Sequence, residues 1–172
     1  MRKNRLILIN SGAITLIITG IMNLLLFPII EDGTAGMRFF DMNTTGYSVE
    51  ACREFLSSLS VQGRGVALHI QLPLDFVYPV IYTAFFIAAI WALIGKKSKL
   101  NLLPFLLFIT DYIENICSVK ILNSSMPSDS IIKFASTVTL LKNILMYLIF
   151  GIIAVLFIIF LVKKTKEKQI NK

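Results

Sequence analysis

Long runs of apolar residues, each interrupted by a few polar ones, divide the chain into four segments. They cover residues 6–30, 66–94, 100–122 and 131–162, and each is long enough to cross a hydrocarbon core of about 30 Å as a helix. We expect helices because an open sheet would leave backbone groups without partners in lipid. The fourth segment is roughly 48 Å long if wholly helical, so its outer end projects or the helix tilts. The pattern predicts an all-α, four-helix transmembrane bundle that forms one integral membrane domain over residues 1–172.

The composition agrees with this architecture, since 56% of the residues are hydrophobic, 16% are charged and the mean hydropathy is +0.77. A soluble domain carries about 25% charged residues. The first segment follows Arg2, Lys3 and Arg5, as the apolar core of a signal peptide would. Its apolar stretch is longer than the about 7–15 residues of a signal peptide, so we expect it to remain as a true span.

Basic residues are concentrated in three places that flank the spans. They precede the first span, occupy the link between the second and third spans (Lys96, Lys97 and Lys99), and follow the fourth span from Lys163 onward. By the positive-inside rule, we expect a plasma-membrane protein with both termini and this link in the cytoplasm. The net charge of +7 then follows from topology and anionic lipid, and we expect no nucleic-acid partner.

Two segments then lie outside, a short turn at residues 123–130 and a long segment at residues 31–65, which exceeds a simple connector. The run after Ser48 predicts a short amphipathic helix that Ser48 caps. Its apolar face comprises Val49, Cys52, Phe55, Leu56 and Leu59. We expect that face to lie on the outer membrane surface or to cap the bundle, either as simple packing or as a functional lid. Residues 62–65 are predicted to form a turn into the second span.

Ionisable and polar residues inside the spans are the strongest functional signal, because a carboxylate in hydrocarbon costs about 3 kcal/mol or more. They recur at helical spacing and form one stripe on each span. The stripes comprise Asp111, Glu114, Asn115 and Ser118 on the third span, Asp75, Tyr78 and Tyr82 on the second, Ser136, Thr139 and Lys142 on the fourth, and Thr15, Thr19 and Asn23 on the first. At 1.5 Å per residue the charged members reach the outer half of the bundle, with Asp111 deepest. We expect these stripes to face inward and form a pocket open to the outside.

The charge balance of this cluster narrows its chemistry. Three carboxylates and one ammonium sum to −2, so in a low dielectric at least one acid is protonated or bound to a cation. The candidate catalytic residues are Asp111, Glu114 and Asp75, and the candidate ligand-binding residues are Asn115, Tyr78, Tyr82, Lys142 and Asn23. Such a set suits acid–base chemistry, binding of a cationic group or proton relay. A polar network that only fixes helix packing fits the same residues, so whether the protein is an enzyme stays open.

Signals for other chemistry are weak. Cys52 and Cys117 give no metal-ligand spacing and no CxxC motif, although a disulfide between them is topologically allowed. His69 lies off the Asp75 face and is interpreted as an interfacial histidine. The sequence contains no nucleophile elbow, phosphate-binding glycine loop or HExxH motif, so no cofactor is indicated.

The chain contains four short elements in a recognisable order. They are Tyr47, Gly63-Arg64, the run from Leu74 to Tyr82, and Asp111-Tyr112-Ile113-Glu114-Asn115. This order resembles a group of small, uncharacterised bacterial four-span membrane proteins. That group has an Asp followed by an aromatic–Pro pair on span two and Asp-x-x-Glu-Asn on span three. The resemblance covers residues 47–142 and implies the four-span fold without implying an activity.

Three functional hypotheses follow from the cluster. The first is a pocket that binds or processes a lipid head group or a small amphiphile, with Lys142 holding an anionic moiety. The second is a proton- or cation-coupled transporter, which requires a homodimer because four helices rarely enclose a full path. The third is an accessory or immunity-type subunit whose polar residues only fix packing. The expected partners are membrane lipid, a small amphiphilic ligand and, for transport, a second copy.

Overall fold

The computed structural model describes residues 2–95 and 98–170, and every regular element in these residues is helical. Four helical segments are long and apolar enough to cross a membrane, which confirms the predicted architecture. They are α1 (Arg2–Ile21) continued by η1 (Met22–Leu26) and α2 (Phe27–Ile30); α4 (Val61–Val66) continued by η3 (Ala67–Gln71) and α5 (Leu72–Ile94); η4 (Lys99–Asn101) continued by α6 (Leu102–Asn123); and α7 (Asp129–Ile170). Lys96, Lys97 and Lys172, on which part of the topology prediction rests, lie outside the described residues.

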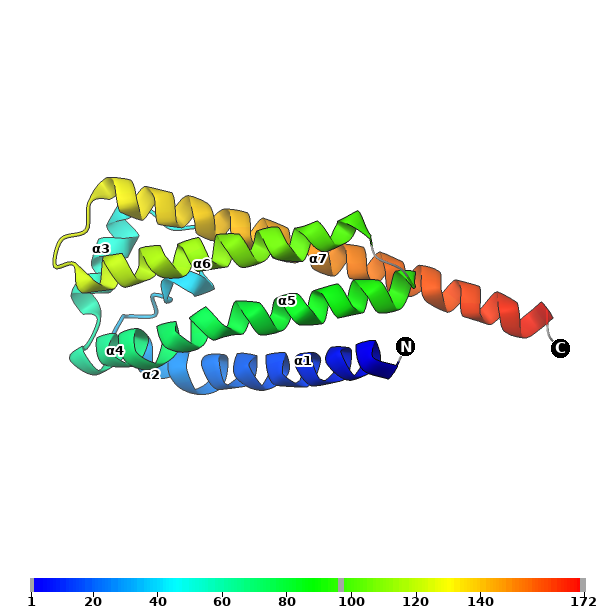
Figure 1. Ribbon diagram of the computed structural model, residues 1–172. Helices are drawn as coiled ribbons and strands as arrows, with labels where there is room; N and C mark the ends of the chain where they lie inside the picture. The colour runs from blue at the N-terminus through cyan, green and yellow to red at the C-terminus, as the bar shows by residue number, and fades with distance from the viewer. Residues whose placement is uncertain (1, 96–97, 171–172) are drawn as a thin grey trace.

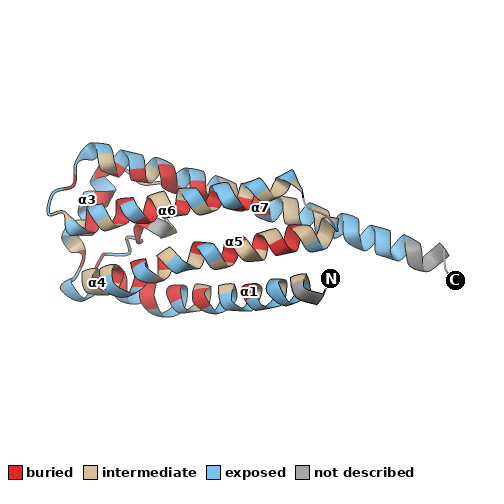
Figure 2. Ribbon diagram, viewed as in Figure 1, coloured by how far each residue is buried: buried red, intermediate tan, exposed pale blue. Residues whose placement is uncertain are grey.

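The four segments form an antiparallel bundle in which α1 packs on α5, α5 on α6, and α6 on α7 (Figure 1). Both termini lie at one end, which we call the terminal end, as an even number of spans requires. The opposite end, which we call the loop end, carries residues 31–60 and the short α6–α7 turn. Buried positions follow the inward faces of the helices and are densest toward the loop end (Figure 2).

The second span begins at Val61, five residues before the predicted position, so the expected turn at residues 62–65 is wrong. Ser60 Oγ accepts a hydrogen bond from the backbone N–H of Gly63 at 2.9 Å and starts the helix there. Gly63 lies so close to the end of the first span that a Cβ atom would come within 2.8 Å of Ile30 O. The glycines that suggested a turn therefore permit close helix packing instead.

The fourth span also extends beyond its predicted limit of residue 162, and α7 continues to Ile170. The extension projects from the terminal end of the bundle (Figure 1). Residues 163–170 contain neither Pro nor Gly and are rich in Lys, Glu and Gln, which favour helix. The helix therefore continues past the last apolar residue without a signal to stop.

Two of the spans contain a π-helical turn, η1 and η3, and these two turns contact each other. Each lies immediately before a helix with proline in its first turn, Pro28 after η1 and Pro73 after η3. A proline supplies no N–H, so the carbonyl groups before it need different partners, and a wider turn is one way to provide them. The wider turn also shifts the helical phase of the residues around it.

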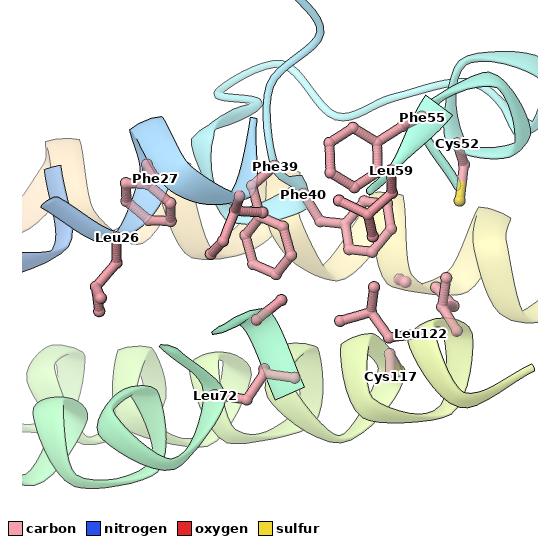
Figure 3. Close-up of a cluster of buried hydrophobic side chains, with 14 of the residues drawn as sticks. Leu26, Phe27, Phe39, Phe40, Cys52, Phe55, Leu59, Leu72, Cys117 and Leu122 are labelled. Atoms are coloured by element: carbon pink, nitrogen blue, oxygen red, sulfur yellow. The ribbon is translucent and has the colours of Figure 1, made fainter. Parts of the chain in front are cut away.

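Residues 31–60 close the loop end with an aromatic core. The rings of Phe39 and Phe40 lie 5.3 Å apart, and Phe40 lies 5.3 Å from Phe55 (Figure 3). All three side chains are buried in one cluster with residues from every span, including Leu72, Leu122 and Ile132. At its edge, the Arg53 guanidinium contacts Asp129 Oδ1 at 2.6 Å.

The short helix predicted after Ser48 is α3 (Val49–Ser58), and Ser48 Oγ accepts a hydrogen bond from Ala51 N–H at 3.1 Å. Of the predicted apolar face, Val49, Cys52, Phe55 and Leu59 are buried and Leu56 is partly buried. Because α3 packs against α7 and the aromatic core, this face caps the bundle and does not lie on the membrane surface.

Candidate functional site

The charged residues singled out in the sequence come together inside the bundle. Among the described residues, the buried charged side chains are Asp75 on α5, Asp111 and Glu114 on α6, and Lys142 on α7. Each is exposed over 6% of its surface or less. Since neighbouring helices contribute them, we call these four residues the acidic cluster.

Glu114 and Lys142 form the centre of the acidic cluster. The Lys142 ammonium contacts Glu114 Oε2, and Thr139 Oγ1 donates a hydrogen bond to Glu114 Oε1 at 2.5 Å. Thr139 lies one turn before Lys142 on α7, so a single face of that helix holds both carboxylate oxygens. Lys142 therefore points into the bundle and is not placed to reach the membrane surface.

Asp111 lies one turn before Glu114 and is held from two sides. The Tyr82 hydroxyl donates a hydrogen bond to Asp111 Oδ2 at 2.6 Å, and Lys142 Nζ lies 4.0 Å from Asp111 Oδ1. Tyr82 is 1% exposed, so it supplies its hydroxyl from a dry environment in which the charge-assisted bond is strong. Asp111 thereby links α5, α6 and α7.

Asp75 lies nearer the loop end of α5. A hydrogen bond from α6 to its backbone carbonyl replaces the one that Pro79 cannot donate. Pro79 has no N–H, so the carbonyl of Asp75, four residues earlier, lacks its usual partner within the helix. Asn115 Nδ2 on α6 donates to that carbonyl oxygen at 2.8 Å. The Asp75 carboxylate itself accepts a hydrogen bond from Gln71 Nε2 at 2.8 Å.

The first span contributes through Thr19 and not through Asn23. Thr19 Oγ1 and the Tyr78 hydroxyl lie 2.7 Å apart, and the Tyr78 ring makes an edge contact with Tyr82 at 5.1 Å. Asn23 is exposed, and its Nδ2 donates to the carbonyl of Thr19. The structure does not bring Asn23 to the cluster, because Asn23 lies in the π-helical turn that ends the four-residue repeat.

Sequence reasoning assigned no site role to two residues that belong to this site, Gln71 and Tyr47, although Tyr47 opens the order of residues that carries the resemblance. Gln71 lies four residues before Asp75, a helical spacing that could have identified it. Tyr47 lies in the loop before α3, where helical spacing gives no signal. Its hydroxyl is next to Thr139 and within the field of Glu114, and burial raises the pKa of Tyr47 far above its ordinary value.

No protein family, curated protein or solved structure matches this chain. The geometry of the site must therefore carry the functional argument by itself. Within the described residues, no group of three His, Cys, Asp or Glu side chains is arranged to hold a metal ion. His69 is exposed, and Cys52 and Cys117 are buried, free thiols in the loop-end core.

Two of the loop-end cavities flank Tyr47, and among the described residues neither is lined by a residue of the acidic cluster; apolar side chains lie on the other side of the cluster. One cavity of about 370 Å³ lies between Tyr47, Ser48 and α7, and a second of about 350 Å³ lies on the α3 side of Tyr47. Toward the terminal end, Phe86, Leu107 and Ile149 pack with Tyr82 in a buried cluster. Tyr47 lines both cavities and lies next to Thr139, so it is the residue between these cavities and the Thr139–Glu114 pair.

Proposed function

We propose that this chain is a multi-pass plasma-membrane protein that binds the cationic head group of a small amphiphile at its acidic cluster. The observation that carries the proposal is the buried charge balance of three carboxylates against one ammonium. The Lys142 ammonium contacts Glu114 and lies 4.0 Å from Asp111, so one cation serves carboxylates that outnumber it. A bound amine restores neutrality in a region where isolated charge is costly.

The position of the site favours an amphiphile over a free solute. The acidic cluster lies on helices that are long and apolar enough to cross a membrane and whose outward faces are apolar, which supports a site at membrane depth. A ligand with an ammonium group and a hydrocarbon tail can place one part in the cluster and the other in lipid or in the loop-end core. Tyr78 and Tyr82 provide aromatic faces beside the carboxylates, which suit a cationic group.

The proposed orientation places both termini in the cytoplasm and the loop end outside. Its support is the concentration of basic residues at the terminal end, where Arg5, Lys99 and Lys163 flank the spans. The ligand would then reach the cluster from the extracytoplasmic side. A transport cycle is less well supported, because the apolar packing of Phe86, Leu107 and Ile149 lies between the cluster and the terminal end.

Binding of dodecylamine to the full-length protein in nanodiscs tests the proposal, with dodecanol as the matched neutral amphiphile. We expect dodecylamine to bind and raise the unfolding temperature, and dodecanol to leave it unchanged. Asp111→Asn keeps an acceptor for Tyr82 but removes the charge, so it should weaken dodecylamine binding by about 2 kcal/mol or more, roughly 30-fold in Kd. Asp32→Asn makes the same charge change at an exposed residue and should bind as the wild type does.

Two outcomes would contradict the proposal. One is equal binding of dodecylamine and dodecanol, which would show that the tail alone determines binding. The other is unchanged dodecylamine binding in Asp111→Asn with wild-type unfolding behaviour, which would show that the Asp111 charge takes no part in binding.

A further inference from the structure

A short segment before α3, residues 43–48, lies across the loop end and touches α7; we call it the strap. The backbone N–H of Tyr47 donates to Ser136 Oγ at 2.8 Å. The preceding residue, Gly46, has φ +80°, and a Cβ atom there would lie 2.7 Å from Ser136 Oγ. Only glycine adopts this conformation without strain and permits so close an approach, so Gly46 allows the strap to pack directly against Ser136 on α7.

Tyr47 separates two open spaces from the acidic cluster. Its ring lies 5.3 Å from Phe40 and lines both loop-end cavities. Its hydroxyl lies next to Thr139, which donates to Glu114. Within the described part of the chain, that buried hydroxyl makes no well-formed hydrogen bond. Thr139 is the side chain nearest to pairing with this hydroxyl, which can take a water molecule or a ligand group as a further partner.

We propose that the cavity between the strap and α7 is the access route to the acidic cluster, and that Tyr47 is the gate and specificity residue on that route. This inference rests on the proposed function, because it names the path by which the cationic head group arrives. Rotation of the Tyr47 ring would join the cavity to the Thr139–Glu114 pair. The Tyr47 hydroxyl would then accept a hydrogen bond from the ammonium group as it passes.

The walls of the cavity are polar. They include two carboxylates, Glu50 and Asp129, and one ammonium, Lys133, and the Arg53 guanidinium pairs with Asp129, so positive and negative charges at the mouth balance. The remaining polar groups are hydroxyls such as those of Ser48 and Thr137, which can accept hydrogen bonds from an ammonium.

A native cysteine can report how often the access route opens. Cys117 lies three residues after Glu114 on α6, is 5% exposed and faces the region of Tyr47. In full-length protein carrying Cys52→Ala, Cys117 is the single cysteine. A membrane-impermeant cationic thiol reagent, trimethylammonium-ethyl methanethiosulfonate, therefore measures how often the route opens.

We expect slow modification of Cys117 in the Cys52→Ala protein and an increase of at least about tenfold when Tyr47→Ala removes the ring, since the reaction follows the open population. Thr45→Ala, an exposed strap position, should leave the rate unchanged. The anionic sulfonatoethyl reagent should react more slowly than the cationic one. An equal rate in Tyr47→Ala and Thr45→Ala would overturn the gate, whatever the dodecylamine result.

Tyr47→Phe tests the gate without removing the ring. In Cys52→Ala protein we expect Tyr47→Phe to leave the modification rate of Cys117 unchanged, because the ring still closes the route, and to weaken dodecylamine binding, because the hydroxyl acceptor is lost. A Cys117 modification rate in Tyr47→Phe as high as in Tyr47→Ala would overturn the ring as the gate while leaving the proposed function intact. Failure of the unmodified protein to bind dodecylamine would contradict the proposed function itself.

Discussion

Lys142 and Glu114 meet across the α6–α7 interface with 8% and 1% of their side chains exposed. Removing one partner of such a pair leaves an uncompensated buried charge, which is far more costly than losing the pair. Lys142→Met removes the ammonium that Glu114 and Asp111 share and should therefore lower the free energy of unfolding by about 3–5 kcal/mol. Glu114→Gln should cost less, because Asp111 Oδ1 still lies 4.0 Å from the Lys142 ammonium. The double substitution should cost less than the sum of the two, because both changes remove the same ion pair.

Reversible unfolding of the detergent-solubilised protein measures these three variants. Lys133→Met, which removes an exposed ammonium nine residues earlier on the same helix, is the matched control and should change stability little. Additive effects of the two single substitutions would show that the pair does not interact.

Two glycines two residues apart in α4 should respond to alanine with opposite signs. A Cβ atom at position 63 would lie 2.8 Å from Ile30 O, whereas one at position 65 would meet nothing within 4 Å. Gly63→Ala forces the first two spans apart and should cost about 1–3 kcal/mol. Gly65→Ala removes backbone entropy from a helix and should stabilise by about 0.5–1 kcal/mol. Thermal unfolding of both variants decides the point, and equal effects would contradict the close contact at Ile30.

The sequence predicted the spans and one face of the acidic cluster for clear physical reasons. Hydrocarbon fixes the length of a spanning helix, and the i, i+3, i+4, i+7 spacing on α6 placed Asp111, Glu114, Asn115 and Ser118 on one buried face. These signals depend only on residues near one another in the chain, so they can be recognised without the tertiary structure.

What the sequence did not predict depends on changes of phase and on contacts between distant segments. Asn23 does not face the cluster because it lies in η1, where the turn is wider. A π-helical turn has no strong sequence signature here beyond Pro28. Tyr47 belongs to the site because the loop before α3 packs against α7, a contact between segments that are distant in the sequence. The partners of each carboxylate, Tyr82 for Asp111 and Thr139 for Glu114, required the relative rotation of three helices.

Cys52 should show a reactivity profile displaced to high pH, because burial raises the pKa of its thiol to about 11. The thiolate is the nucleophile, so at pH 8 its fraction is about a hundredfold below that of an unperturbed cysteine. In Cys117→Ala protein, alkylation by iodoacetamide should rise continuously from pH 8 toward pH 11. The raised pKa also means that folding stability from this group declines as the pH rises from about 9 to about 11.

The same alkylation in denaturant serves as the control for Cys52 and should follow an ordinary thiol. A rate for the folded protein that reaches its plateau below pH 10 would show that the thiol is not desolvated beneath α3.

Asn115 and Pro79 should be energetically coupled, although they lie on different helices. Asn115→Ala leaves the Asp75 carbonyl without a donor and should cost about 1–3 kcal/mol. Pro79→Ala restores the N–H that normally pairs with that carbonyl, so Asn115→Ala should cost less in its presence. A double-mutant cycle on the free energy of unfolding measures the difference, with Asn123→Ala, an exposed amide at the end of α6, as the control. Strict additivity of Asn115→Ala and Pro79→Ala would contradict the assignment of Asn115 as the substitute donor.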